Sequence, residues 1–177
     1  YVSDNSENLE TFDACIELKK KYNLEYHKNN QNIGDKNFLK AISYPVSVYR
    51  WIISDSIIFD QGNLQKIIKI CKTYKYDYIL LNSGRVNIHQ DIEYTDYNKL
   101  LGNLGWHLTL LPSFVYSYKV IQEVEKIKRY ENGNFTQHAL LFEIAPFKNY
   151  KIFWLGSFRM TVVAIKKKNT WTKILFP

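Results

Sequence analysis

Residues 49–56 read YRWIISDS: an apolar stretch, predicted to be a buried strand, runs directly into Ser54, Asp55 and Ser56. Residues 1–8 read YVSDNSEN and repeat this pattern, with an apolar tip followed by small polar and acidic residues. Strands that end in such residues are typical of open α/β sheets, in which ligands bind beyond the carboxyl ends of the strands. Two such strand ends in one chain predict a nucleotide or metal–phosphate site.

The first half of the chain alternates between extended and helical patterns. Strands are predicted at 1–3, 24–27, 49–53 and 76–81, and helices at 9–22, 36–44 and 62–74. In the first of these helices one face carries four apolar side chains, which we expect to pack inward: Leu9, Phe12, Cys15 and Ile16. The alternation predicts a Rossmann-like α/β domain, in which helices cover both faces of a mostly parallel sheet.

The second half of the chain is less regular. Helices are predicted at 94–104, 118–129 and 135–144, and strands at 151–153 and 158–165. The sequence shows no internal repeat, low-complexity tract or Pro/Gly-rich linker, so residues 1–177 are predicted to form one domain. Because the chain begins within a strand-like segment, we expect further sequence to precede it.

Composition restricts the classes of protein. With 177 residues, of which 46% are hydrophobic and 23% charged, the chain is globular and long enough to bury a core. It contains no apolar run of about 18 residues, so no membrane span is predicted. Cys15 and Cys71 are isolated in the sequence, which is typical of reduced thiols in a cytoplasmic protein.

The net charge of +7 has two interpretations. It can attract polyanions such as nucleic acid, anionic lipid or nucleotide phosphates, or it can reflect solvated lysine faces. The lysine clusters at 19–21 and 166–168 stand at a helix end and beside a turn, where solvated lysines are ordinary. RNA-binding sheets interleave aromatic and basic residues on one face. The strands here are apolar, so we expect no nucleic-acid partner and keep weak attraction to a membrane surface as an alternative.

The Asp4 carboxylate is the first candidate contact with a ligand. At a strand end it can accept a hydrogen bond from an N–H group of a nucleobase, while Asn5 and Ser6 bond backbone or ribose. The alternative is a turn and cap that begin the next helix.

The loop NNQNIGDKN at residues 29–37 is the second candidate. Asn and Gly tolerate positive φ, so the backbone around Asn32 and Gly34 can bend close to a ligand. The helix that follows presents free N–H groups, which favour anions. An ordinary loop between a strand and a helix is the alternative.

Asp55 is the third candidate. A divalent cation that bridges a diphosphate needs one or two protein carboxylates. Asp55 can supply one of them, with Ser54 and Ser56 on either side. The alternative is an aspartate that caps a turn.

Together these segments resemble the family 2-type glycosyltransferases with a GT-A fold, most closely the abequosyltransferase-like branch of bacterial surface-polysaccharide transferases. YVSDNSEN resembles the strand end that contacts the nucleobase in this family. NNQNIGDKNFLKA resembles the family's Asn-x-Gly loop and the helix that follows it. YRWIISDSIIF resembles the strand that carries the family's metal-binding Asp motif. The resemblance covers residues 1–85 well and 100–145 more loosely. The resemblance implies a donor half at residues 1–90 and an acceptor half at residues 91–177. The strand that normally comes first in the family has no counterpart in the given sequence.

The resemblance implies a function and a set of contacts. A sugar is transferred, with inversion, from a nucleotide diphosphate sugar to a hydroxyl of a glycan or lipid-linked glycan at the inner face of the cytoplasmic membrane. Mg²⁺ or Mn²⁺ is implied at Asp55. The implied donor-binding residues are Asp4, Asn5, Ser6, Asn32, Gly34, Asn37, Ser54, Asp55 and Ser56.

Two departures from the family pattern bear on catalysis. The metal motif, which usually holds two or three acidic residues, keeps only Asp55. The place of the usual base carboxylate, aligned on Phe135, holds Gln137 and His138. Gln137 cannot take a proton at neutral pH and is expected to orient hydroxyl groups. His138 can act as the base because the ordinary histidine pKa lies near neutrality, or it can be a residue of the helix surface.

Trp106 and His107 are the candidates for the acceptor side, because an indole ring can stack on a sugar. The alternative for Trp106 is packing in the core. Two other functions remain open: a catalytically degenerate domain with a binding or scaffold role and, less favoured, a basic RNA-binding protein.

Overall fold

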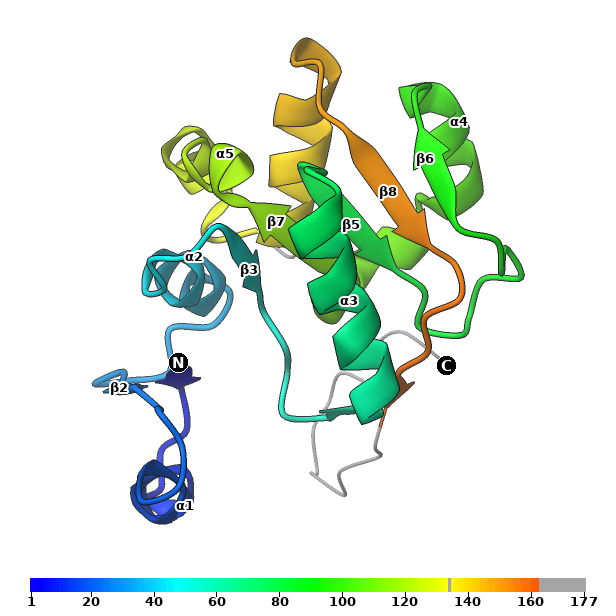
Figure 1. The fold of residues 1–177 in the computed structure, drawn as a ribbon. Coiled ribbons are helices and arrows are strands. Elements are labelled where there is room, and N and C mark those ends of the chain that lie inside the picture. The colour runs from blue at the N-terminus through cyan, green and yellow to red at the C-terminus, as the bar shows by residue number, and fades with distance from the viewer. Residues whose placement is uncertain (134, 163–177) are drawn as a thin grey trace, which may run out of the picture.

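The computed structural model describes residues 1–133 and 135–162. In these residues a central sheet has the strand order β3-β7-β5-β8-β6, and two small sheets pair β1 with β2 and β4 with β9 (Figure 1). The strands are β1 Val2–Asp4, β2 Tyr26–Lys28, β3 Tyr49–Trp51, β4 Ile57–Ile58, β5 Tyr78–Leu81, β6 Ile92–Tyr94, β7 Phe114–Ser117, β8 Ile152–Leu155 and β9 Thr161–Val162.

Helices and single helical turns connect these strands. The α-helices are α1 Glu10–Lys19, α2 Lys36–Ser43, α3 Gln61–Thr73, α4 Tyr97–Leu104, α5 Tyr118–Ile121 and α6 Thr136–Ala139. The 3₁₀ turns are η1 His107–Thr109, η2 Leu111–Ser113, η3 Val124–Tyr130 and η5 Ala145–Phe147, and the π-helical segment is η4 Leu140–Ile144. None of the helices in the described part of the chain is long and apolar enough to cross a membrane.

Strand β5 lies in the middle of the core, with all four of its residues buried. Its side chains alternate between two clusters, as the period of a strand requires. Ile79 and Leu81 face α3, which lies in front of the sheet in Figure 1. Tyr78 and Leu80 face the cluster that α2, α4, α5 and α6 complete. The predicted α/β domain with helices on both faces of a sheet is therefore confirmed.

The strand directions differ from the expected, mostly parallel arrangement. β8 is parallel to β5, but β7 is antiparallel to both β3 and β5, and β6 is antiparallel to β8. As a result β3, β5 and β8 run in one direction, and β6 and β7 run in the other. Between β5 and its antiparallel neighbour β7 the chain passes through β6, α4, η1 and η2.

The first two strands form a parallel pair with α1 beside them, and Figure 1 shows this unit joined to the central sheet through α2. The expectation that one face of α1 packs inward was wrong for three of its four residues. Cys15 is buried, but Leu9, Phe12 and Ile16 are 65%, 39% and 42% exposed. The two short strands β1 and β2 offer little surface for α1 to cover. The ring of Phe12 packs edge-on against the ring of Tyr26 in β2.

Helix boundaries in the second half also differ from the sequence-based prediction. The predicted helix 94–104 begins only at Tyr97, because Asp96 accepts hydrogen bonds from the N–H groups of Asn98 and Lys99 and so caps α4. The predicted helices 118–129 and 135–144 change to 3₁₀ and π geometry after one turn. Of the predicted strand 158–165, β9 forms within the described residues, and the rest lies outside them together with lysines 166–168.

Candidate functional site

The predicted nucleotide-binding loop is held by side-chain amides. Asn5 donates to Asn32 Oδ1 at 2.6 Å, and the same oxygen accepts the Gly34 N–H at 2.9 Å. Asn5 Oδ1 in turn accepts the Ile33 N–H at 2.9 Å. Gly34 has φ +56°, a left-handed conformation that glycine adopts without strain. The structure therefore brings Asn5, Asn32 and Gly34 together; their role in binding a donor stays a prediction.

Asn37 joins this group from the first turn of α2. Its Oδ1 accepts hydrogen bonds from Ser3 Oγ at 2.6 Å and from Asn29 Nδ2 at 2.9 Å. Asn29 is buried, and its own Oδ1 accepts from Lys40 Nζ at 2.5 Å. Asn29 and Lys40 were not predicted as site residues. The signal that could have found Asn29 is its place at the start of the Asn-rich loop.

Asp4 is only 3% exposed, and its carboxylate is fully used inside the protein. One oxygen accepts from the N–H and the hydroxyl of Ser6 at 2.8 and 2.6 Å, and the other from Tyr26 Oη at 2.5 Å and Lys28 Nζ at 3.0 Å. Burial alone raises the pKa of Asp4, but these hydrogen bonds outweigh it and hold the pKa well below its usual range. A nucleobase would have to replace one of these bonds to reach Asp4.

Ser54, Asp55 and Ser56 follow the end of β3. Asp55 is exposed, and the hydroxyls of Ser54 and Ser56 lie 3.0 Å apart. Trp51 Nε1 donates to the Pro112 carbonyl at 2.8 Å, which fixes the end of β3 against η2. In the described part of the chain no three His, Cys, Asp or Glu side chains come together as metal ligands. The residues present fit only one type of cation site, in which a single protein carboxylate binds Mg²⁺ and phosphates and water supply the other ligands.

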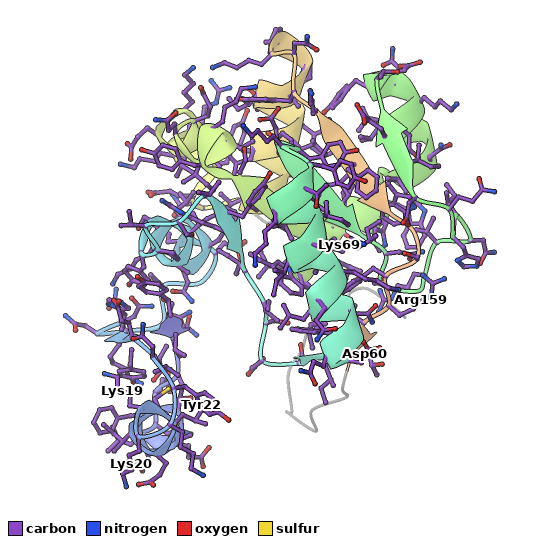
Figure 2. All side chains as sticks on the ribbon, viewed as in Figure 1. Lys19, Lys20, Tyr22, Asp60, Lys69 and Arg159 are labelled. Carbon is purple, nitrogen blue, oxygen red and sulfur yellow. The ribbon has the colours of Figure 1, made fainter. Side chains whose placement is uncertain are left out.

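Asp60, the next acidic residue after Asp55, has a structural role. Its carboxylate accepts the Asn63 N–H at 2.6 Å and caps α3. Asn63 Nδ2 donates to the Arg159 carbonyl at 2.8 Å, and Figure 2 shows Asp60 and Arg159 close to the same end of α3. Asp60 therefore caps α3 and holds Asn63, which ties the helix to the segment that leads into β9.

The predicted catalytic residues lie at the start of α6, against η1. Gln137 is buried and donates to the Thr109 carbonyl at 3.1 Å. His138 Nε2 donates to the Leu108 carbonyl at 2.5 Å, so Nδ1 carries the lone pair, and it has no hydrogen-bond partner among the described residues. Burial lowers the pKa of His138 from its ordinary value of 6.5. At neutral pH the ring is neutral and able to accept a proton at Nδ1.

Backbone conformation around α6 is unusual. Phe135, directly before the helix, has φ +66°, and its ring stacks on His138 with ring centroids 5.4 Å apart. Left-handed conformations at non-glycine residues store strain, and π-helical segments such as η4 are frequent at functional sites. Both features surround His138, although neither was visible in the sequence.

Trp106 and His107 lie side by side but differ in exposure. Trp106 is 58% exposed, which rules out the alternative that it packs in the core. His107 is 0% exposed; its Nε2 donates to the Leu81 carbonyl at 2.9 Å, and its Nδ1 faces Ser83 Oγ at 3.4 Å. In this structure His107 therefore offers no surface to an acceptor, and it ties the end of β5 to η1.

The turn η1 and the start of α6 form one region at the carboxyl end of β5, which we call the strand-end site: residues 106–109 and 137–138. Gln137 and His138 hold α6 to η1, and His107 holds η1 to Leu81 of β5, each through a hydrogen bond to a main-chain carbonyl. Residues 54–56 follow β3, where Trp51 donates to the carbonyl of Pro112 in η2. The amide network of Asn5 and Asn32 belongs to the β1–β2 unit instead. The predicted site residues thus fall into two groups on two sheets.

No protein-family model matches the sequence, and no curated protein matches it. Solved structures match by fold: a crystal structure of S. aureus TarS 1-349 has a TM-score of 0.65 at 16% identity, covering 90% of this chain and 49% of that chain. The same protein in complex with UDP has a TM-score of 0.66 at 18% identity, covering 90% and 48%. The chain spans about half the length of these TarS chains. The likeness shows the fold: the chain has a GT-A-type α/β fold similar to that of TarS 1-349.

Proposed function

We propose that this chain transfers a sugar from a nucleotide diphosphate sugar to an acceptor hydroxyl. The observation that carries the proposal is the likeness of fold, over 90% of the chain, to a TarS structure that holds UDP. The two groups of predicted donor residues support it, because the first follows the carboxyl ends of the parallel strands β1 and β2 and the second follows that of β3. Open α/β folds bind ligands at such ends.

Donor binding in this proposal uses both groups. Asn5, Asn32 and Asn37 shape the loop that receives the nucleoside, while Asp4 holds the end of β1 in place through its bonds to Ser6 and Lys28. Ser54, Asp55 and Ser56 face the diphosphate. A divalent cation at Asp55 would be Mg²⁺ or Mn²⁺, and when bound it would neutralise charge on the leaving diphosphate.

The proposed reaction is a direct displacement with inversion. The acceptor oxygen forms a bond to the anomeric carbon, and the bond between that carbon and the diphosphate oxygen breaks, so the diphosphate leaves with the electron pair. The hydroxyl proton passes to Nδ1 of His138, whose lone pair is free because Nε2 donates to Leu108. Gln137, fixed to Thr109, keeps α6 and η1 in register for this transfer.

On the acceptor side, the exposed ring of Trp106 is proposed to stack on the sugar that receives the new bond. A lipid-linked glycan at the inner face of the cytoplasmic membrane, and membership of the abequosyltransferase-like branch, are proposals that rest on the family resemblance alone. The division into donor residues 1–90 and acceptor residues 91–177 rests on it as well.

The decisive experiment is a titration of the protein with UDP, GDP, CDP and dTDP, with and without Mn²⁺, followed by thermal unfolding. A ligand at 100 times its Kd that binds only the folded state adds about 2.7 kcal/mol of stability. We expect one nucleotide to stabilise in a Mn²⁺-dependent manner, and Asp55→Ala to remove this effect. Asp13→Ala, an exposed aspartate of α1, is the matched control. Absence of a shift with every nucleotide would contradict the proposal.

The rival function is a degenerate domain that binds a donor without turnover. The single carboxylate at the metal motif favours it, since the described residues form no larger metal-binding group. Transfer or hydrolysis of a radiolabelled nucleotide sugar would exclude this rival, whereas nucleotide binding without release of the sugar would establish it.

A further inference from the structure

The end of the central sheet that lies opposite the strand-end site carries very exposed apolar side chains. Val46 is 93% exposed, Phe147 84% and Val48 72%, and these are the largest values for large hydrophobic side chains in the described part of the chain. Tyr74 and Tyr118 are exposed at the same end. Single exposed apolar residues are ordinary, but a group of them on one surface marks an interaction site.

Hydrogen bonds place these side chains on one surface, which we call the amino-end surface: residues 46–48, 74–75, 118–119 and 147–151. It forms where β3, β5 and β8 begin and β7 ends, and Figure 1 shows α5, the end of α3 and the beginning of β8 along its upper edge. The N–H of Tyr118 donates to the Val48 carbonyl at 2.7 Å, and the N–H of Asp77 donates to the Lys151 carbonyl at 2.8 Å. The loops that carry the apolar side chains are therefore neighbours.

The carboxylates beneath the amino-end surface are buried and neutralised by lysines. Asp77 and Glu123 are both buried. Lys119 Nζ donates to Asp77 at 3.2 Å, and Lys126 and Lys148 form ion pairs with Glu123. The negative charges of this end of the sheet therefore lie inside, and the positive charges that balance them lie outside.

Two more lysines give the amino-end surface an excess of positive charge. Lys75 and Lys151 are exposed, and neither has a carboxylate partner in the part of the chain that the structure describes. The surface therefore combines exposed apolar side chains with unpaired positive charge. A partner that fits it must offer both an apolar layer and negative charge.

A second group of exposed apolar residues, on α1, has the opposite charge around it. Leu9 and Ile16 are exposed there, but the same helix exposes Glu10, Asp13 and Glu17. Carboxylates repel an anionic partner, so this helix lacks the combination that the amino-end surface shows. It provides a matched control for exposed apolar area without positive charge.

We propose that the amino-end surface binds the surface of an anionic lipid bilayer. Peripheral proteins bind such bilayers by placing apolar side chains among the headgroups, while lysines face the lipid phosphates. In this arrangement Val46, Val48 and Phe147 enter the headgroup layer, and Lys75 and Lys151 lie at its surface. The strand-end site, at the other end of β5, faces away from the bilayer. The proposal does not depend on the transfer of a sugar.

The test is flotation of the protein with vesicles of phosphatidylcholine and phosphatidylglycerol in equal parts, and with vesicles of phosphatidylcholine alone. We expect binding to the mixed vesicles only. Binding should be lost between ~0.1 M and ~1 M salt, because the Debye length falls from about 10 Å to about 3 Å. Phe147→Ser should weaken binding about tenfold through loss of buried apolar area, and Lys151→Gln about fivefold. Leu9→Ser on α1 is the control and should bind as the wild type does.

Folding and self-association are measured on the same variants. The melting temperature of Phe147→Ser should equal that of the wild type, because the ring is exposed. Absence of binding to the mixed vesicles would overturn the proposal, as would equal binding to phosphatidylcholine alone or an equal loss in Leu9→Ser. A dimer in the absence of vesicles that Phe147→Ser dissociates would make a second copy of the chain the partner instead. Because the assay contains no nucleotide, its failure is separate from failure of the proposed transferase.

Discussion

At the level of single residues, Asp4 shows that a carboxylate at a strand end can have all its hydrogen-bonding capacity satisfied within the protein. Four donor groups from Ser6, Tyr26 and Lys28 surround it, and Lys28 Nζ also donates to the Ser6 and Asn8 carbonyls. The sequence predicted correctly that Asp4 lies at a strand end beside Asn5 and Ser6. It could not show that Tyr26 and Lys28, from the neighbouring strand β2, would saturate the carboxylate.

This arrangement predicts an effect on stability. Asp4→Asn should destabilise the protein by about 2 kcal/mol, because donors buried around a carboxylate lose charged hydrogen bonds. The folded pKa of Asp4 lies below 3.8, so its contribution is present above pH 3.8 and is lost as the pH falls through the folded pKa. Urea unfolding at neutral and acid pH checks both points. The exposed Asp13→Asn is the control, and an equal loss in that variant would contradict the prediction.

His138 carries a second prediction at this scale. If it removes the acceptor proton, kcat/KM should fall as the pH drops through its lowered pKa, below 6.5, because protonation blocks Nδ1. His138→Gln should reduce kcat by about 10²–10⁴-fold, the usual contribution of a general base, and leave nucleotide affinity unchanged. The exposed His89→Gln should keep both activity and the pH profile. A wild-type profile that is flat across this range would exclude His138 as the base.

At the level of elements, the strand-end site depends on short, irregular turns. η1 receives hydrogen bonds from Gln137 and His138 of α6, while His107 fastens it to β5. Sequence periodicity predicted a helix through residues 135–144 but not its change to π geometry at Leu140, since periodicity carries no signal for a single inserted residue. It also could not predict that β7 is antiparallel, because the apolar run Phe114–Ser117 suits a buried strand in either direction.

The buried His107 gives this region a dependence on pH. Burial lowers its pKa from 6.5, so its contribution to stability is present above that value and is lost as the pH falls through the lower, folded pKa. Thermal unfolding should therefore show a lower melting temperature below pH 6.5. His107→Phe should destabilise the protein by about 1–3 kcal/mol, because the Leu81 carbonyl loses its donor, but its melting temperature should vary less with pH. If the melting temperature of His107→Phe depends on pH as strongly as that of the wild type, a group other than His107 causes the dependence.

At the scale of the whole molecule, the predicted donor residues are divided between two sheets, and Figure 1 shows the β1–β2 unit beside α2 rather than within the central sheet. The order of segments along the chain predicted both groups of residues, because each is local in sequence. How far apart the two groups lie depends on which strands pair with one another, and a local sequence pattern does not predict this pairing. A nucleotide sugar that contacts both groups would couple the unit to the sheet.

This coupling can be measured by hydrogen exchange. Without ligand, β5 should be the most protected strand, since all its residues are buried in the core, and β1 and β2 should exchange faster because exposed residues of α1 flank them. Addition of UDP with Mn²⁺ should slow exchange in residues 1–37 and in 54–56 together, with the same concentration dependence, if one ligand joins the two groups. Asp55→Ala should weaken protection in both segments, including the distant one. Protection confined to residues 54–56 would mean that the Asn5–Asn32 network is structural and that the nucleoside lies elsewhere.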